Sequence, residues 1–417
     1  MSSETSEIAD TSSSCVSECE RSVKSNKSSR SRGPPNGPTE GFGPRRDVNY
    51  GKNPCPLKSF CDYGLSNGCH SAPLVNQRCP YKTITTWRAN YLVSSTPNDA
   101  AHVDPDLVLP GAMVILNNQI WTTSINHDVV LCYDLFGNKV LGSISVRFNN
   151  EVAAFPIGLA PNCNGGFRFR PPVLGARAFD ASLIVTTFTG NIMAVNPATD
   201  TTEGYLVLDN AHTGEIAQYS GCCIVGNLLY VADWNNGHID VFDSHYIRIG
   251  GVGKLFNDNY SIDPIPVSYS CNNVTYIKPY IYVMYAERDV GAVASITGPG
   301  RGYISVFTLD GGFVRRFVSR GVLNSPYDII PAPNECGFPE NSFLVGNEGD
   351  GRINIFDYYG NHIGPMFSQS GIPITVDGLR TIAPFYTTTN SIYFGSSNDP
   401  NTNGVIGCFT RDQVIKF

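Results

Sequence analysis

One strand-turn-strand unit occurs six times along this 417-residue chain, and the repetition restricts the fold more than any other feature. Each copy has an apolar strand, a polar turn rich in Asn, Asp and Gly, and a second apolar strand. The two clearest copies, residues 228–243 and 342–357, align residue for residue, and looser copies occupy residues 119–134, 183–197, 280–309 and 391–409. The copies are about 45 to 64 residues apart, which is typical of a four-stranded propeller blade with insertions.

A further short strand, opening near Pro or Gly, precedes each copy. We expect these six segments to be the innermost strands of a ring; they are residues 110–116, 156–161, 219–225, 266–271, 326–333 and 377–385. The chain has 21 Tyr, 22 Phe, 41 Gly and 28 Pro, the aromatic residues and turn formers that many short strands need. No stretch keeps the apolar spacing of an amphipathic helix over three turns. The sequence therefore predicts an all-β, six-bladed β-propeller.

A ring of blades has to be closed. Residues 85–94 (TTWRANYLVS) precede the first blade and can add an outer strand to the C-terminal blade. We therefore expect deletion of residues 83–94 to destabilise the whole ring, and deletion of residues 1–50 to leave it intact.

Composition divides the chain into three parts. Residues 1–54 are rich in Ser and basic residues and nearly lack aliphatic ones, which is typical of a disordered arm. Residues 55–82 form a cysteine-bearing linker, and residues 83–417 form the propeller. The net charge is −7, yet residues 21–46 carry seven basic side chains, so any contact with nucleic acid is expected only through this stretch. A solvated tail is the commoner outcome for such a segment.

Neither a membrane span nor a secretory signal is visible, because no apolar run approaches eighteen residues and the first residues are polar. The sequence does not indicate a compartment.

The cysteines fall into two groups. Cys132 and Cys408 align with aliphatic positions of the repeat, and Cys222, Cys223 and Cys271 fall on expected inner strands, so these thiols are expected to be structural. The linker cysteines lie in segments too polar to bury them, and no zinc-finger spacing occurs among them. We interpret them as disulfide candidates, within a chain or in a disulfide-linked oligomer; they are Cys55, Cys61, Cys69 and Cys79.

The segments SRGVLNSP and LVGNEGDGRIN, within residues 318–357, resemble a family of uncharacterised, mostly bacterial propeller proteins that are distantly similar to NHL-repeat proteins. The resemblance covers roughly residues 90–409. It implies a six-bladed propeller and no particular activity. Bacterial members typically have a secretion signal and often a surface anchor, whereas this chain has a basic, cysteine-containing arm. Related propellers also occur in large DNA viruses that infect amoebae, so the resemblance implies a virion location if the chain is viral. Otherwise a cytoplasmic location is expected, because no signal or membrane span is visible.

The expected channel offers few groups for catalysis. Its inner strands supply Asp328, Asp377 and Arg380 among mostly apolar residues, and Asn324 and Asn347 could add oxygens only from turns. Lactonase propellers hold a divalent metal there, and hard cations need several converging oxygen ligands. We therefore assign no catalytic residue, metal or cofactor, and we expect Asp328 to pair with Arg380.

Polar turns and one insertion are the remaining candidate sites. Asn, Asp and Gly are the residues that tight turns need, and this structural role is the first interpretation. The alternative is a binding rim at the turns, made of Asp233, Asn235, Asn347, Asp350 and Arg352. The insertion that runs from Glu287 to Arg301 is the preferred contact loop. The histidines are scattered, and none pairs with Cys or Asp at a ligand spacing.

These features favour a non-enzymatic scaffold or binding protein with a protein or glycan partner. The alternative is a metal-dependent hydrolase or lactonase with a channel site.

Overall fold

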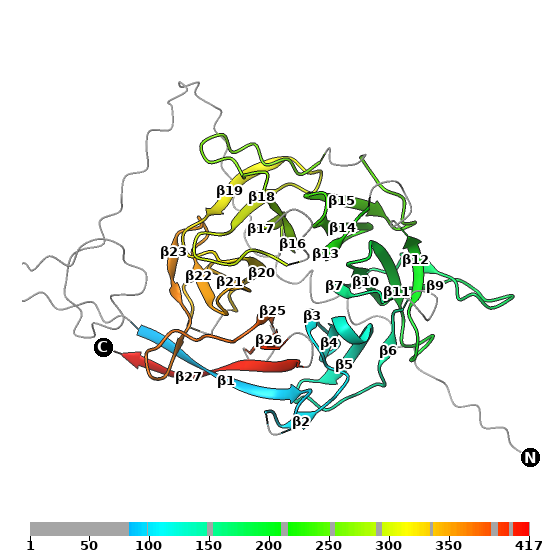
Figure 1. Cartoon of the computed structure of the whole chain (residues 1–417), viewed down its shortest axis with the longest axis horizontal. Coiled ribbons are helices and arrows are strands. Elements are labelled where there is room, and N and C mark those ends of the chain that lie inside the picture. Colours follow the sequence, from blue (N-terminus) through cyan, green and yellow to red (C-terminus); the bar gives the residue numbers. More distant parts are fainter. Residues whose placement is uncertain are drawn as a thin grey trace, which may run out of the picture. The chain divides into compact units, whose positions relative to one another are not determined.

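The computed structural model describes residues 83–416, apart from residue 98 and segments 148–152, 210–215, 251–254, 289–293, 334–336, 385–390 and 400–402. The expectations for the arm, the linker and its four disulfide candidates fall outside these residues and stay predictions. The described residues form six antiparallel sheets arranged as blades around a central axis (Figure 1), which confirms the predicted six-bladed propeller. No helix among them is long and apolar enough to span a membrane.

Each blade is a meander whose first strand is the innermost. Blade 1 contains β3 (Pro110–Leu116), β4 (Gln119–Ser124), β5 (Val129–Asp134) and β6 (Ile144–Ser145). Blade 2 contains β7 (Pro156–Pro161), β10 (Leu183–Thr187), β11 (Asn191–Val195) and β12 (Tyr205–Asp209). Blade 3 contains β13 (Tyr219–Val225), β14 (Leu228–Asp233) and β15 (His238–Asp243).

The other three blades follow the same order. Blade 4 contains β16 (Tyr269–Ile277), β17 (Tyr280–Glu287), β18 (Tyr303–Phe307) and β19 (Phe313–Ser319). Blade 5 contains β20 (Pro326–Pro331), β21 (Phe343–Asn347), β22 (Ile353–Phe356) and β23 (His362–Pro365). Blade 6 contains β25 (Leu379–Pro384), β26 (Ile392–Ser396), β27 (Val405–Lys416) and β1 (Thr83–Ser94).

Five short elements supplement the blades. They are η1 (Ile125–His127) between β4 and β5, the β8–β9 hairpin (Arg168–Phe169 and Phe179–Asp180), and two strands that pair in parallel with β1, namely β2 (His102–Val103) and β24 (Phe367–Ser368).

The predicted inner strands are confirmed. β3, β7, β13, β16, β20 and β25 contact one another in that order, and β25 contacts β3, which closes the circle. Three of the strands differ in their bounds from the expectation, β20 and β25 by at most two residues at an end. β16 ends at Ile277 rather than at residue 271, and it begins at Tyr269 rather than at residue 266. There, the Tyr269 amide donates to the Pro266 carbonyl in a turn, at 3.0 Å.

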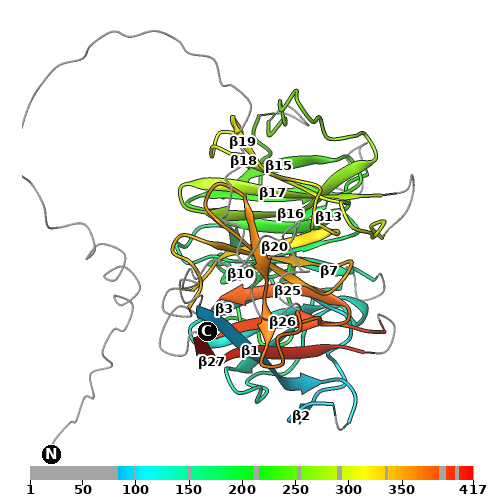
Figure 2. The same cartoon turned by 90° about the vertical axis from the view of Figure 1, so that its left-hand side faces the viewer.

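The closing strand is also where the sequence predicted it. β1 pairs antiparallel with β27 from Thr83 opposite Lys416 to Ser94 opposite Val405. Figures 1 and 2 show β1, at the N-terminal end of the described chain, beside β27 at the C-terminal end. Trp87 and Val93 of β1 are fully buried, and the Trp87 ring stacks on Phe338 at 4.9 Å. The ring is therefore joined by a sheet made from both ends of the propeller.

One apolar cluster fills each of the six spaces between neighbouring blades. Alternate side chains of the central strands point to opposite faces of a blade, so each strand contributes to two clusters. Cys132 lies in the cluster between blades 1 and 2, and Cys408 in the cluster between blades 6 and 1. Both thiols are buried, as their alignment with aliphatic positions predicted, and burial raises the pKa of Cys132 to about 12.

Candidate functional site

The channel is closed at the end of the ring where each inner strand begins. The register of the inner strands skips one residue there, and such a β-bulge re-aims the side chain of the extra residue. Ile157 is the bulged residue of blade 2 and Tyr327 that of blade 5. Although these blades face each other across the ring, both side chains pack in one buried cluster with Ile125 of η1. This end of the channel is therefore closed by apolar groups.

Polar contacts hold this plug in place. The Tyr327 hydroxyl donates to the Ser220 carbonyl of blade 3 at 2.6 Å, so the side chain links two blades that are not adjacent. Arg380, the bulged residue of blade 6, lies over the Tyr327 ring at 5.3 Å. Its Nη1 donates to Oε1 of Glu348, in the β21–β22 turn, at 2.7 Å. The ion-pair partner of Arg380 is thus Glu348 and not the expected Asp328.

Asp328 is used within the sheet. Its Oδ1 accepts from Asn273 Nδ2 at 2.7 Å, and its Oδ2 accepts from the Ile382 amide at 2.9 Å. Burial raises the pKa of this carboxyl to about 6. Asp377 is an exposed residue of the turn before β25. The two channel carboxylates are therefore not brought together around a common ligand position.

The polar turn residues stabilise the backbone. Asp233 Oδ1 accepts from the amides of Gln218 and Asn236, and Asn235 Nδ2 donates to the Ile216 carbonyl at 2.7 Å. In blade 5, Asn347 Nδ2 donates to the Val322 carbonyl at 2.8 Å, and Asp350 Oδ1 accepts from the Arg352 amide at 3.3 Å. Asn324 Oδ1 likewise accepts from the Gly298 amide at 2.6 Å. These contacts agree with the turn interpretation, and the binding rim stays a prediction.

The long insertion of blade 4 is fastened at its base. Glu287 and Arg301, at its two ends, form an ion pair, and Ser325 Oγ donates to Ser295 Oγ at 2.7 Å. Its middle lies outside the described residues, so the contact-loop interpretation stays a prediction.

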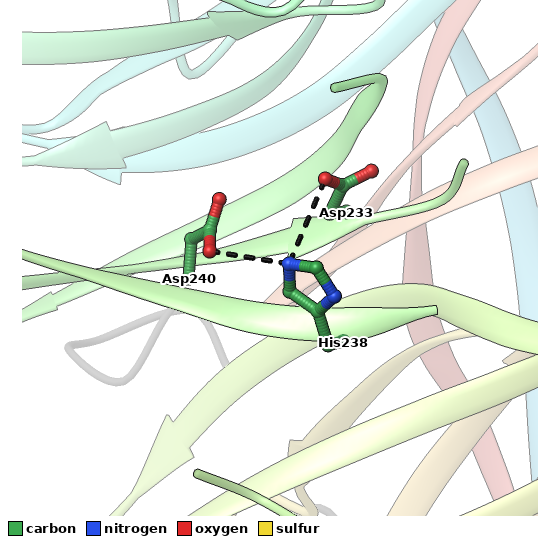
Figure 3. A group of neighbouring side chains, drawn as sticks. All are labelled: Asp233, His238 and Asp240. Carbon is green, nitrogen blue, oxygen red and sulfur yellow. Dashed lines mark ion pairs between the residues drawn. The ribbon is translucent and has the colours of Figure 1, made fainter. Parts of the chain in front are cut away.

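A cluster that sequence reasoning missed lies on the face of blade 3 that packs against blade 2 (Figure 3). His238 begins β15, with Asp233 opposite it at the end of β14 and Asp240 two residues further along β15. The Nε2 atom of His238 is 3.3 Å from Asp240 Oδ1 and 3.9 Å from Asp233 Oδ2. Among the residues that the structure describes, this is the group of His, Cys, Asp or Glu side chains whose geometry suits a metal ion.

Burial and charge perturb the members of this cluster in different ways. Burial raises the pKa of Asp233, although hydrogen bonds from Asn236 and Gln218 oppose the shift. For His238, burial by itself would lower the pKa. The hydrogen bond and charge of Asp240, together with the charge of Asp233, act in the opposite direction and outweigh burial, so the pKa is raised above its usual value. The arrangement can thus hold a positive charge on or beside the imidazole.

The missed signal is the register of one hairpin. Asp233 and His238 flank a four-residue turn, and Asp240 is on the same face of β15 as His238. Pairing β14 with β15 through this turn therefore brings all three side chains together. Ligand spacing along the chain does not reveal this group, because its side chains meet across the hairpin.

A second buried histidine gives a pH prediction. His362 Nε2 lies 3.2 Å from Asn354 Oδ1 in blade 5, and burial lowers the pKa of His362 to about 4. An unfolded chain takes up this proton near pH 6.5, so stability present above pH 6.5 is lost as the pH falls towards 4. From pH 7 to pH 4, the wild type is expected to lose about 2 to 3 kcal/mol more unfolding free energy than His362→Gln, measured by urea denaturation.

The control for this experiment is His245→Gln, because the His245 side chain is 82% exposed. It should keep the wild-type pH dependence. An unchanged pH dependence in His362→Gln would contradict the assignment of the acid sensitivity to His362.

No protein-family profile matches the chain. Two relatives come from Acanthamoeba polyphaga mimivirus. “Uncharacterized protein L690” is 47% identical over 367 residues, which are 88% of this chain and 97% of the relative. “Uncharacterized protein R648” is 46% identical over 383 residues, which are 91% of this chain and 94% of the relative.

Among solved structures, a protein of unknown function from Bacteroides thetaiotaomicron superposes with a TM-score of 0.50. The superposition covers 78% of this chain and 76% of that one, with 10% sequence identity. At this identity the likeness shows the fold alone.

Proposed function

Because this chain belongs to the family of uncharacterised six-bladed propeller proteins that includes L690 and R648 of Acanthamoeba polyphaga mimivirus, we propose that it is a non-enzymatic viral binding or scaffold protein. The observation that carries the proposal is the closed channel. A catalytic propeller needs a space on its axis where a substrate meets converging polar groups. Here Tyr327, Ile157 and Ile125 close one end of the channel.

The contacts of the channel carboxylate also argue against the alternative, a metal-dependent hydrolase or lactonase. A channel metal needs several oxygen ligands that point to one place. Asp328 instead accepts hydrogen bonds from Asn273 and Ile382 on the two neighbouring inner strands. A carboxylate used in this way joins blades 4, 5 and 6, which is a structural role.

A protein partner is favoured by the β8–β9 hairpin, which projects from the ring in Figure 1. Its tip carries Val173, 68% exposed, and Leu174, fully exposed. The hairpin also carries Arg168, Arg170 and Arg177, against Asp180, which pairs with Arg168 at 3.2 Å. An exposed apolar tip flanked by positive charge is suited to a partner with an apolar surface rimmed by acidic groups.

Virion association is tested by quantitative mass spectrometry of gradient-purified particles of the virus that encodes the chain. We expect the protein to be enriched in particles over infected-cell extract, and its spectra to disappear from particles of a deletion virus. Detection in the extract but not in the particles would exclude the virion role.

The enzymatic alternative is tested with the full chain on lactone and ester substrates, with and without Ca²⁺ or Zn²⁺. We expect no hydrolysis above the rate without protein. Metal-dependent hydrolysis by the wild type that Asp328→Ala abolishes would overturn the non-enzymatic proposal.

A further inference from the structure

We propose that Asp233, His238 and Asp240 bind a divalent transition-metal ion such as Mn²⁺ or Zn²⁺ in the space between blades 2 and 3. All three ligands belong to β14 and β15, so the ion would hold these two strands together beside the turn that joins them. The site is independent of the proposed binding function, because a structural ion needs no substrate.

The ligand atoms already have suitable separations. The imidazole Nε2 lies 3.3 Å from one carboxylate oxygen and 3.9 Å from the other, and all three atoms are within 4.8 Å of one another. An ion about 2.0 to 2.2 Å from each ligand in tetrahedral geometry separates neighbouring ligand atoms by about 3.3 to 3.6 Å. Small side-chain shifts would therefore complete the coordination.

Two of the atoms lack any other partner. The Asp240 side chain is 1% exposed, and apart from their contact with each other at 3.3 Å, neither its Oδ1 nor His238 Nε2 forms a hydrogen bond. Both atoms point into the same space, together with Asp233 Oδ2 (Figure 3). A bound divalent ion would replace this single contact with coordination by all three ligand atoms.

Neighbouring groups also hold the two carboxylates in place and would orient them as ligands. Asp240 Oδ2 accepts from Arg248 Nη2 at 2.8 Å and from the Tyr219 hydroxyl at 3.1 Å. Asp233 Oδ1 accepts from the Gln218 and Asn236 amides, and Asp233 Oδ2 accepts from Asn236 Nδ2 at 2.8 Å. The two carboxylates carry a charge of −2 and Arg248 carries +1, so a net negative charge faces the space where the ion would bind.

The same position in the neighbouring blade lacks this donor set. By strand register, Tyr285 and Tyr303 of blade 4 correspond to Asp233 and His238. Neither tyrosine supplies a carboxylate or an imidazole ligand. Ser305 takes the place of Asp240. Blade 3 thus departs from its neighbour by combining two carboxylates with an imidazole.

The position in blade 5 also lacks carboxylates. Asn347 and Asn354 correspond to Asp233 and Asp240 by register. Uncharged amides are weak ligands for transition metals, whereas imidazole and carboxylate ligands together suit Mn²⁺ and Zn²⁺. The repeated hairpin therefore brings three side chains together at this position, and in blade 3 these side chains are ones that can bind a metal ion.

The experiment uses the full chain, freed of metal with a chelator and titrated with Mn²⁺ under electron paramagnetic resonance detection. Mn²⁺ is the probe because thiolates of the 13 cysteines compete for Zn²⁺ but poorly for Mn²⁺. We expect one bound Mn²⁺ per chain, with the affinity lowered at least about tenfold in Asp240→Asn and in His238→Gln. His245→Gln, in the same blade and 82% exposed, should bind like the wild type.

Circular dichroism establishes which variants are folded. If both cluster variants fold, the Mn²⁺ affinity of Asp240→Asn, the more conservative change, is compared with that of the wild type; if one folds, that variant is used. As a second readout, saturating Mn²⁺ should raise the thermal unfolding temperature of the wild type and of His245→Gln, but not that of Asp240→Asn. The proposal is overturned if the wild type binds no Mn²⁺ at millimolar concentration, or if both cluster variants bind it as tightly as the wild type. Neither result bears on hydrolysis or on virion association, so the proposed function is judged separately.

Discussion

A chain that lacks residues 83–94 is expected to lose the cooperative thermal unfolding transition of the propeller. The deletion removes β1, which pairs with β27 along its whole length and carries two fully buried apolar side chains, Trp87 and Val93. Without β1, blade 6 exposes an unpaired edge and the apolar clusters on both of its faces open to water. Circular dichroism during heating measures the effect.

A point variant of β1 is expected to lower the stability of the propeller by a smaller amount that can be measured. Trp87→Ala is expected to cost about 3 to 5 kcal/mol, because it leaves a cavity where the indole stacks on Phe338. For a domain of this size, the melting temperature should fall by about 6 to 20 °C. A chain that lacks residues 1–50 is the control and should melt like the wild type. If the 83–94 deletion also melts like the wild type, β1 does not close the ring.

Tyr327→Ala is expected to destabilise the propeller by about 3 to 5 kcal/mol, because the ring of Tyr327 fills the axis among Ile157 and Ile125. Tyr327→Phe keeps the ring and removes the hydroxyl that donates to the buried Ser220 carbonyl, so it should cost about 1 to 3 kcal/mol. Urea denaturation gives both values. Tyr359→Ala, at a side chain 70% exposed, should stay within about 0.5 kcal/mol of the wild type.

The order of these variants tests the closed channel directly. If Tyr327→Ala costs no more than Tyr359→Ala, the Tyr327 ring does not fill the axis and the main support for a non-enzymatic propeller is lost. Opening the channel should not create hydrolysis either, because Asp328 remains bonded to Asn273 and Ile382.

Several features could be predicted because they depend on local patterns. The apolar alternation of residues 228–243 and 342–357 marks two strands and a turn wherever they lie in the fold. Cys132 and Cys408 could be placed in buried positions because aliphatic residues stand at the same place in other copies. The closing strand could be predicted because residues 85–94 form an apolar segment that precedes the first blade and belongs to none of the repeated units.

The contacts of Arg380 could not be predicted in the same way. Asp328 and Arg380 both belong to inner strands, which made a pair between them plausible. The β-bulge at the start of β25 turns Arg380 towards the channel end, where Glu348 of a polar turn accepts its hydrogen bond. Turn composition alone does not distinguish a carboxylate that caps a turn from one that reaches a neighbouring blade.

The sequence by itself determined the number of blades, the strand that joins the two ends and the apolar character of the axis, because these follow from a repeated pattern of side-chain polarity. Only the tertiary structure decided that Tyr327 crosses the ring to Ser220, and that His238 stands between Asp233 and Asp240. The reason is physical. Strand register and ring closure bring together side chains that are distant or out of step along the chain, and they decide which charges meet in the same buried space.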